Sequence, residues 1–301
     1  IISLNENIDV VCFERAIDAV IDRHEILRTV FKADERGEIR QWILNREDIG
    51  FRIGYRDFRE EENKENQVKE YIASDSDKAF DLAHGPLLRA SLLQVDDKSY
   101  EFHFNMHHII SDGWSMEVLS KDVLSYYEAY KAKKEPSLQE LRIQYKDYSA
   151  WQLAQLEATS FEVHRAYWLE NLKGELPVLD LPFSKQRPRI KSYKGRGLST
   201  YIDAVTTAKL KKYSESNGGS LFMGLLTAWN ILMYRYTGQK DIITGSPIAG
   251  RTHADLEDQI GFYVNTLALR NEIRPDENFN ELFSRVKHTT LHAYSHQLYP
   301  F

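Results

Sequence analysis

The residues best suited to chemistry lie in one short stretch, MHHIISDGWS at positions 106–115. It holds two histidines, His107 and His108, and a few residues later an acidic side chain, Asp112, followed by Gly113. An imidazole can accept a proton near neutral pH, and it can also orient an attacking nucleophile. The stretch therefore indicates proton transfer or nucleophile positioning as its candidate chemistry.

The histidines are expected at the end of a strand that covers residues 100–108. Because side chains alternate along a strand, His108 shares a face with apolar residues and His107 shares the other face with polar ones. The apolar residues are Phe102, Phe104 and Met106. An imidazole on an apolar face is partly removed from water, which favours the neutral form that accepts a proton.

Asp112 is expected where the next helix begins. A role as the helix N-cap would by itself explain an aspartate there. The carboxylate could also pair with an arginine and so hold the turn that presents His108. The amides of the first helical turn, near Gly113, could stabilise a developing oxyanion.

Other kinds of site have less support in the sequence. An HxxxD pattern alone is weak evidence, since a structural histidine would give the same pattern. His103 and His107 share a strand face, but no third ligand lies nearby, so zinc is a poor fit. The sequence has no GxSxG nucleophile elbow and no GxxxxGK or GxGxxG phosphate loop.

The elements that must position these residues alternate between helices and strands. Helices are expected at 9–27, 61–77, 113–131, 145–157, 161–172, 206–215, 221–236 and from 278 to the end. Strands are expected at 29–32, 39–44, 51–55, 87–95, 100–108, 198–202, 241–245 and 263–270. The alternation predicts an α/β or α+β fold in two comparable lobes, residues 1–175 and 198–301, with a Pro- and Gly-rich crossover at 176–197.

The composition excludes several classes of protein. Of the 301 residues, 42% are apolar and 28% are charged, as in ordinary globular domains. The net charge of -6 gives no reason to expect nucleic acid or an anionic membrane as a partner. No run of residues is apolar enough to cross a membrane, and Cys12, the sole cysteine, allows neither an internal disulfide nor a Cys-rich zinc site. We expect a cytoplasmic protein.

Six stretches, in order along the chain, resemble motifs of the condensation domains of nonribosomal peptide synthetases. The stretch at 106–115 resembles the signature HHxxxDG, which is the most specific of the six. The other five are Arg23–Phe31 (RHExLRTxF), Tyr145–Trp151 (YxDYAxW), Gly245–Arg251 (GxPxAGR), Ile260–Arg270 (IGxFVNTxxxR) and His296–Phe301 (HQDxPFE). Their order, and their spread over nearly the whole chain, make a chance match negligible.

The resemblance implies a fold like that of chloramphenicol acetyltransferase, with two lobes in a V and the active site between them. It implies an acyltransferase of secondary-metabolite or antibiotic biosynthesis that binds no cofactor of its own. The 4'-phosphopantetheine arms of upstream and downstream peptidyl carrier domains would bring the donor and acceptor thioesters, and an adenylation domain would be a neighbour. The acceptor amine would attack the donor thioester and form an amide.

The resemblance also implies roles for single residues. His108 would orient the attacking amine, accept its proton or stabilise the charge that forms, and these alternatives stay open. Asp112 would be structural and would pair with Arg23 or Arg28, of which we favour Arg23. Asn265 would either face the substrate tunnel as a polar positioning group or be a buried amide satisfied by the backbone.

Further details of the resemblance concern the subtype. Trp114 and Ser115 resemble the LCL subgroup, which joins an L-configured donor terminus to an L-acceptor.

Tyr145 and Trp151 are expected to pack rather than react. The alternatives are an epimerisation domain, an acyltransferase of the same fold that uses coenzyme A or an alcohol, and a catalytically silent domain that docks carriers.

The two ends of the chain depart from the family pattern. The first family motif is absent, and Leu298 stands where the sixth has Asp. We therefore expect a piece of a longer multidomain chain whose second lobe is incomplete.

Overall fold

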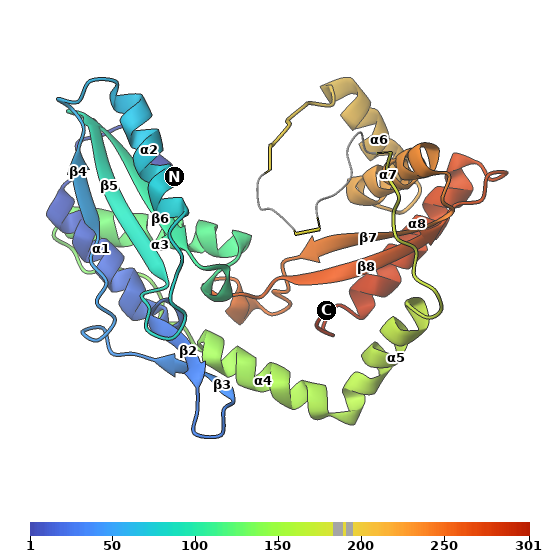
Figure 1. Cartoon of the computed structure of the whole chain (residues 1–301), viewed down its shortest axis with the longest axis horizontal. Helices are drawn as coiled ribbons and strands as arrows, with labels where there is room; N and C mark the ends of the chain where they lie inside the picture. The colour runs from blue at the N-terminus through green and yellow to red at the C-terminus, as the bar shows by residue number, and fades with distance from the viewer. Residues whose placement is uncertain (183–188, 191–194) are drawn as a thin grey trace. The chain divides into compact units, whose positions relative to one another are not determined.

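The structure is a computed structural model that describes residues 1–182, 189–190 and 195–301. It contains mixed helices and strands, as expected (Figure 1). The chain divides into two compact units, each built from two separate segments. The first unit comprises Ile1–Gln155 and Arg251–Val264, and the second comprises Leu156–Gly250 and Asn265–Phe301.

These units do not coincide with the expected lobes. Residues 156–175 belong to the second unit rather than the first, and residues 251–264 return to the first unit from within the expected second lobe. Part of the expected crossover at 176–197, residues 183–188 and 191–194, lies outside the described residues.

The first unit is built on a four-stranded sheet in the order β1-β6-β5-β4. Its long central pair, β5 and β6, is antiparallel, and β4 runs parallel to β5. The strands are β1 (Ile2–Leu4), β4 (Gly54–Asp57), β5 (Leu88–Asp96) and β6 (Ser99–Met106). A separate antiparallel hairpin, β2 (Thr29–Ala33) with β3 (Ile39–Ile43), confirms the strands expected at 29–32 and 39–44.

Four helices accompany these strands: α1 (Val10–Arg23), α2 (Lys64–Ser76), α3 (Gly113–Lys131) and α4 (Tyr145–Glu157). Apolar side chains at helical spacing on α1 and α3 pack together on one face of the sheet, where Phe13 meets Phe102 edge to face at 5.0 Å. On the opposite face Val68 of α2 packs against Leu93. Alternation along β5 and β6 therefore separates an apolar face under α1 and α3 from a more polar face under α2.

The second unit pairs β7 (Asp241–Ile248) with β8 (Asn265–Glu272) in an antiparallel ladder. Its helices are α5 (Glu162–Asn171), α6 (Ala204–Ser216), α7 (Leu221–Thr237) and α8 (Phe279–Ser295). The core lies where the strands meet α7 and α8, and it includes Ile242, Leu267, Leu226 and Val286.

Several elements differ from the sequence predictions. The helix expected from 278 to the end stops at Ser295, and the strand expected at 51–55 lies at Gly54–Asp57. The short β1 was not predicted. The strand predicted at 100–108 ends at Met106, and a 3-10 turn, η2 (His108–Ile110), follows it. The strand predicted at 198–202 is absent from this described part of the chain, where Leu198 and Tyr201 are 96% exposed and have no neighbouring strand to support them.

Candidate active site

Asp112 is the N-cap of α3, as its position in the sequence predicted. Its Oδ1 accepts hydrogen bonds from the Ser115 amide at 2.9 Å and the Ser115 hydroxyl. Ser115 Oγ accepts in return from the Asp112 amide at 3.2 Å, so the two residues form a reciprocal capping box. The helix that follows the histidines therefore begins at a tightly defined point.

The Asp112 carboxylate also forms a buried ion pair. Arg251 Nη2 lies 3.1 Å from Asp112 Oδ1, and the two side chains are 1% and 3% exposed. Asp112 Oδ2 accepts the amide of Tyr263 at 3.1 Å, and Arg251 Nη1 donates to the Gln259 carbonyl at 2.8 Å. A buried carboxylate needs such partners, and here they tie the start of α3 to the segment 251–264.

The predicted pairing of Asp112 with Arg23 or Arg28 is therefore wrong. Arg23 Nε instead lies 3.0 Å from Asp122 Oδ2, farther along α3, and His24 Nε2 lies 2.9 Å from the same oxygen. Arg28 Nη1 donates to the Leu44 carbonyl at 2.8 Å. Both arginines are already engaged with other partners, so neither serves the N-cap of α3.

His108 is exposed and begins the turn η2. The expectation of an imidazole on an apolar strand face is wrong, because β6 ends at Met106 and the alternation of side chains ends with it. The ring of His108 instead meets Phe262 edge to face, with centroids 5.2 Å apart. The imidazole is thus open to solvent on one side and rests on an aromatic ring on the other.

His107 has a different role in the same turn. It is half-buried, and its Nδ1 accepts the amide of Ile109 at 3.0 Å, which makes His107 the N-cap of η2. An Nδ1 that accepts places the proton of the neutral ring on Nε2. His107 thus holds the turn, and His108 is the histidine that the turn presents.

Gly113 is exposed at the first position of α3, and a Cβ built there meets no atom within 4 Å. The neighbouring Trp114 is 41% exposed and donates its indole N–H to the Glu257 carbonyl at 2.8 Å. Because Asp112 takes the Ser115 amide, an oxyanion at this helix end would have to meet the amides of Gly113 or Trp114.

Three tyrosines pack together at the segment 251–264. Tyr145 and Tyr148 lie against the ring of Tyr263 at 5.2 and 4.7 Å, and Tyr145 donates its hydroxyl to the Phe262 carbonyl at 3.0 Å. Burial raises the pKa of Tyr145 to about 12, so the phenol stays protonated. The packing role expected for Tyr145 fits this geometry, whereas Trp151 is 44% exposed and contacts the cluster through Tyr148.

Asn265, at the start of β8 in the second unit, uses its whole amide on the backbone. Its Nδ2 donates to the Gln297 and Tyr299 carbonyls at 2.8 and 2.7 Å. Its Oδ1 accepts the amides of Thr266 and Phe301 at 2.8 and 3.0 Å. Of the two roles expected for Asn265, this geometry favours the amide satisfied by the backbone.

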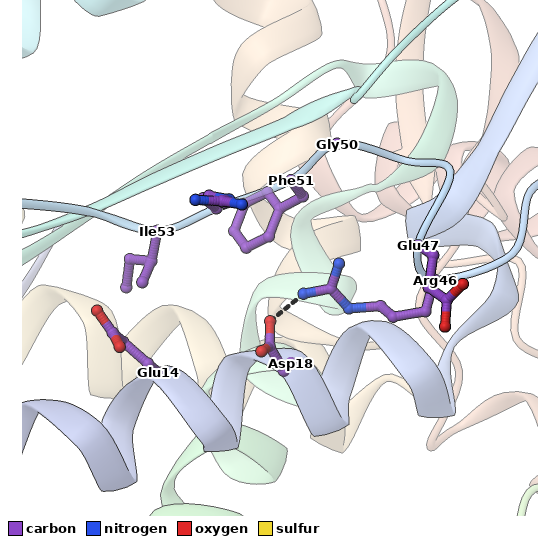
Figure 2. A pocket seen from close by; sticks show the side chains of 8 residues that line it. Glu14, Asp18, Arg46, Glu47, Gly50, Phe51 and Ile53 are labelled. Carbon is purple, nitrogen blue, oxygen red and sulfur yellow. Dashed lines mark hydrogen bonds and ion pairs between the residues drawn. The ribbon is translucent and has the colours of Figure 1, made fainter.

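A cavity of about 520 Å³ lies between α1 and the loop that precedes β4 (Figure 2). Asp18 of α1 forms an ion pair with Arg46 across it, and the Phe51 ring lies at its side. None of its lining residues belongs to the His107–Ser115 stretch or to the segment 251–264. The cavity is therefore separate from the candidate active site.

Two kinds of feature are absent from the described residues. These residues contain no group of three or more His, Cys, Asp or Glu side chains placed to hold a metal ion. Among the helices of 1–182, 189–190 and 195–301, none has the length and apolar content that a membrane span requires.

Comparison with known proteins supplies the family. The family model of the Condensation domain matches residues 1–301. The chain belongs to the condensation domain family. It is thus an acyltransferase-type enzyme domain, which confirms the class and the fold that the motifs predicted.

The relatives are much longer than this domain. It is 42% identical over 300 residues to a linear gramicidin synthase of Brevibacillus parabrevis, covering 99% of this chain and 4% of that protein. It is 40% identical over 300 residues to bacitracin synthase 2 of Bacillus licheniformis, covering 100% of this chain and 11% of that protein. Condensation domains are thus small parts of these relatives.

Solved structures share the fold. The X-domain from teicoplanin biosynthesis matches with a TM-score of 0.89 and 26% identity, over 99% of this chain and 66% of that one. The condensation domain from monacolin K polyketide synthase matches with a TM-score of 0.84 and 21% identity, over 99% and 66%.

Sequence reasoning missed Arg251 as the partner of Asp112. The signal was present, because Arg251 ends the GxPxAGR stretch and a buried N-cap carboxylate needs a cation. The separation of 139 residues between the two partners concealed it.

Proposed function

We propose that this domain joins a donor acyl or peptidyl thioester to an acceptor aminoacyl thioester, both delivered on phosphopantetheine arms of carrier domains. The acceptor nitrogen attacks the thioester carbonyl, a C–N bond forms, the C–S bond breaks, and the departing thiolate takes up the proton that the amine loses. His108 orients the amine or relays that proton.

One observation carries this proposal: His108 is the exposed residue of a turn that is anchored on both sides. The turn is held at one end by His107 and at the other by the Asp112–Arg251 pair. A side chain used for packing would be buried, whereas a side chain that meets a substrate must be accessible. Fixed backbone around an accessible imidazole supports a role in positioning.

The test replaces His108 and a matched histidine in the full-length protein that carries this chain. We expect His108→Ala to slow amide formation from donor and acceptor thioesters by at least about 100-fold. Its unfolding midpoint should stay near that of the wild type, because the side chain is exposed. His84→Ala is the control, since His84 is also exposed in the first unit and pairs with Asp81 at the surface. Condensation by His108→Ala at the wild-type rate would sink the proposal.

The partners and the location expected from the resemblance are part of this proposal. The proposed partners are carrier domains on both sides and an adjacent adenylation domain. The proposed location is the cytoplasm. The names of the long relatives, which are peptide antibiotic synthases, support the multidomain setting. The LCL subtype indicated by Trp114 and Ser115 is also proposed, and the chirality of the product, resolved by chromatography, separates it from epimerisation.

Recruitment of a partner without turnover is a second candidate function. It is favoured by a match with a TM-score of 0.88 and 26% identity to the X-domain in its complex with OxyB from teicoplanin biosynthesis. Carrier binding by the wild type with no amide product from matched thioesters would support recruitment over condensation.

A further inference from the structure

The polar face of the β5–β6 pair, which α2 covers, carries an interaction that the proposed reaction does not explain. Arg89 faces Asn105 across the two strands, and Ser91 faces His103 in the same way. Asp75 of α2 lies over them, with His103 Nε2 at 3.2 Å from Asp75 Oδ2. This face leads along β6 directly to His107, where the chain enters the η2 turn.

Arg89 is fixed in this cluster by three hydrogen bonds. Its Nε donates to Asp75 Oδ1 at 2.8 Å, and its Nη2 donates to the carbonyls of Asp75 and Lys78 at 2.8 and 2.9 Å. The guanidinium therefore satisfies carbonyl groups where α2 ends, a position that favours a cation. A planar group held by three bonds has little freedom to move.

Phe80 lies between this fixed guanidinium and His107. The Arg89 Cζ atom lies 3.9 Å from the centroid of the Phe80 ring, a close cation–π contact. The same ring meets the imidazole of His107 edge to face, with centroids 6.0 Å apart and planes at 88°. Phe80 therefore transmits the position of Arg89 to the imidazole of His107.

The imidazole of His107 in turn defines the turn that carries His108. The His107 amide donates to the Leu87 carbonyl at 3.0 Å, and this bond holds the backbone of His107 beside the start of β5. Its Nδ1 accepts the Ile109 amide at 3.0 Å. If the ring of His107 rotates, the Ile109 amide loses this partner, and the backbone on both sides of His108 loosens.

We propose that Phe80 is a positioning residue for the condensation reaction: held by Arg89, it fixes the imidazole of His107 and thereby the turn that presents His108. The inference rests on the proposed function of His108 and assigns it a supporting side chain outside the HHxxxDG stretch. Phe80 acts through His107 and touches no reacting atom.

The kinetic test compares two phenylalanines in the full-length protein. Phe80→Leu keeps apolar volume and removes the ring, so we expect kcat for amide formation to fall about 10-fold, with KM for both thioesters within twofold. The matched control is Phe58→Leu, because Phe58 also lies edge-on to an aromatic ring, Tyr71 at 6.3 Å, and near a guanidinium, Arg56 at 6.0 Å. The control should keep the wild-type kcat.

A conservative variant separates positioning from general packing. Phe80→Tyr retains the ring and should restore kcat to within threefold of the wild type. If Phe80→Tyr is as slow as Phe80→Leu, or if Phe58→Leu loses as much activity, the assignment is overturned.

Hydrogen–deuterium exchange tests the connection from Phe80 through His107 to the Ile109 amide without any turnover. We expect Phe80→Leu to speed exchange in the peptide that contains the Ile109 amide, while exchange within α3 stays unchanged. Unchanged exchange at Ile109 would overturn the route through His107, whatever the rate of condensation. A wild-type protein that forms no amide would instead refute the proposed function, and the exchange result would still decide whether Phe80 fixes the turn.

Discussion

The two halves of the stretch 106–115 differ sharply in their surroundings. The second half, from Asp112 to Ser115, is anchored in the interior by its first and last residues, since Asp112 is 5% exposed and Ser115 is fully buried. The first half ends at His108, which is exposed and touches a ring that is itself 40% exposed, that of Phe262. One short motif thus combines a rigid frame, Asp112–Ser115, with an exposed imidazole, that of His108. We expect the frame to govern stability and the imidazole to govern rate.

The largest expected effect tests the frame. Arg251→Met removes the cation from a buried ion pair and leaves the Asp112 carboxylate without compensation. We expect the free energy of unfolding to fall by about 3–5 kcal/mol, measured by chemical denaturation. Arg142→Met is the control, because Arg142 pairs with Asp255 at the surface with 78% of its side chain exposed, and it should cost less than about 1 kcal/mol. Equal losses in the two variants would show that the buried ion pair of Asp112 stabilises the protein no more than a surface pair does.

A second, intermediate effect concerns the other buried aspartate of α3. Asp122 is bound by His24, which is fully buried, and desolvation lowers the pKa of His24 even though the hydrogen bond to Asp122 opposes this. In the unfolded chain a histidine titrates near 6.5, so below that pH the unfolded state binds more protons. The free energy of unfolding should therefore fall as the pH drops from about 6.5 toward the folded pKa, by up to about 1.4 kcal/mol per pH unit.

Urea denaturation at pH 7.5, 6.5 and 5.5 measures this effect, with His24→Gln as the matched variant. Glutamine can still donate to Asp122 but does not titrate. The stability of His24→Gln should therefore depend less on pH than that of the wild type. The same pH dependence in both proteins would rule out His24 as the cause.

The smallest effect on stability is expected at Gly113, an exposed position within the second half. Since a Cβ there meets nothing within 4 Å, Gly113→Ala should change the free energy of unfolding by less than about 0.5 kcal/mol. The added methyl group occupies open space at the start of α3, where an oxyanion would have to meet the Gly113 or Trp114 amide, so we expect amide formation to slow about 10-fold. Full activity in this variant would show that no substrate atom approaches the start of α3.

The sequence predicted much of the fold and the local structure around the candidate site. The helices α1 and α3, the alternation of side chains along β6 and the role of Asp112 as N-cap are local features, and each was predicted from local residues. The class of enzyme followed from six ordered motifs.

What the sequence could not predict depends on contacts between distant residues. The ion pair of Asp112 with Arg251 joins positions 139 residues apart, and no periodicity reveals such a pair. The exposure of His108 was missed because β6 ends at Met106, two residues earlier than predicted. A strand extended to position 108 would have turned the imidazole toward the apolar face. The predicted strand at 198–202 failed because its apolar residues have no neighbouring strand in the described part of the chain.

The ion pair between Asp112 and Arg251 also has a consequence for biosynthesis. The ribosome makes Asp112 first and must add 139 more residues before its cation exists. At about 5–20 residues per second this takes roughly 7–28 s. During that interval the nascent first unit carries an unneutralised carboxylate at the start of α3, so it can complete its fold only after most of the second unit has been translated.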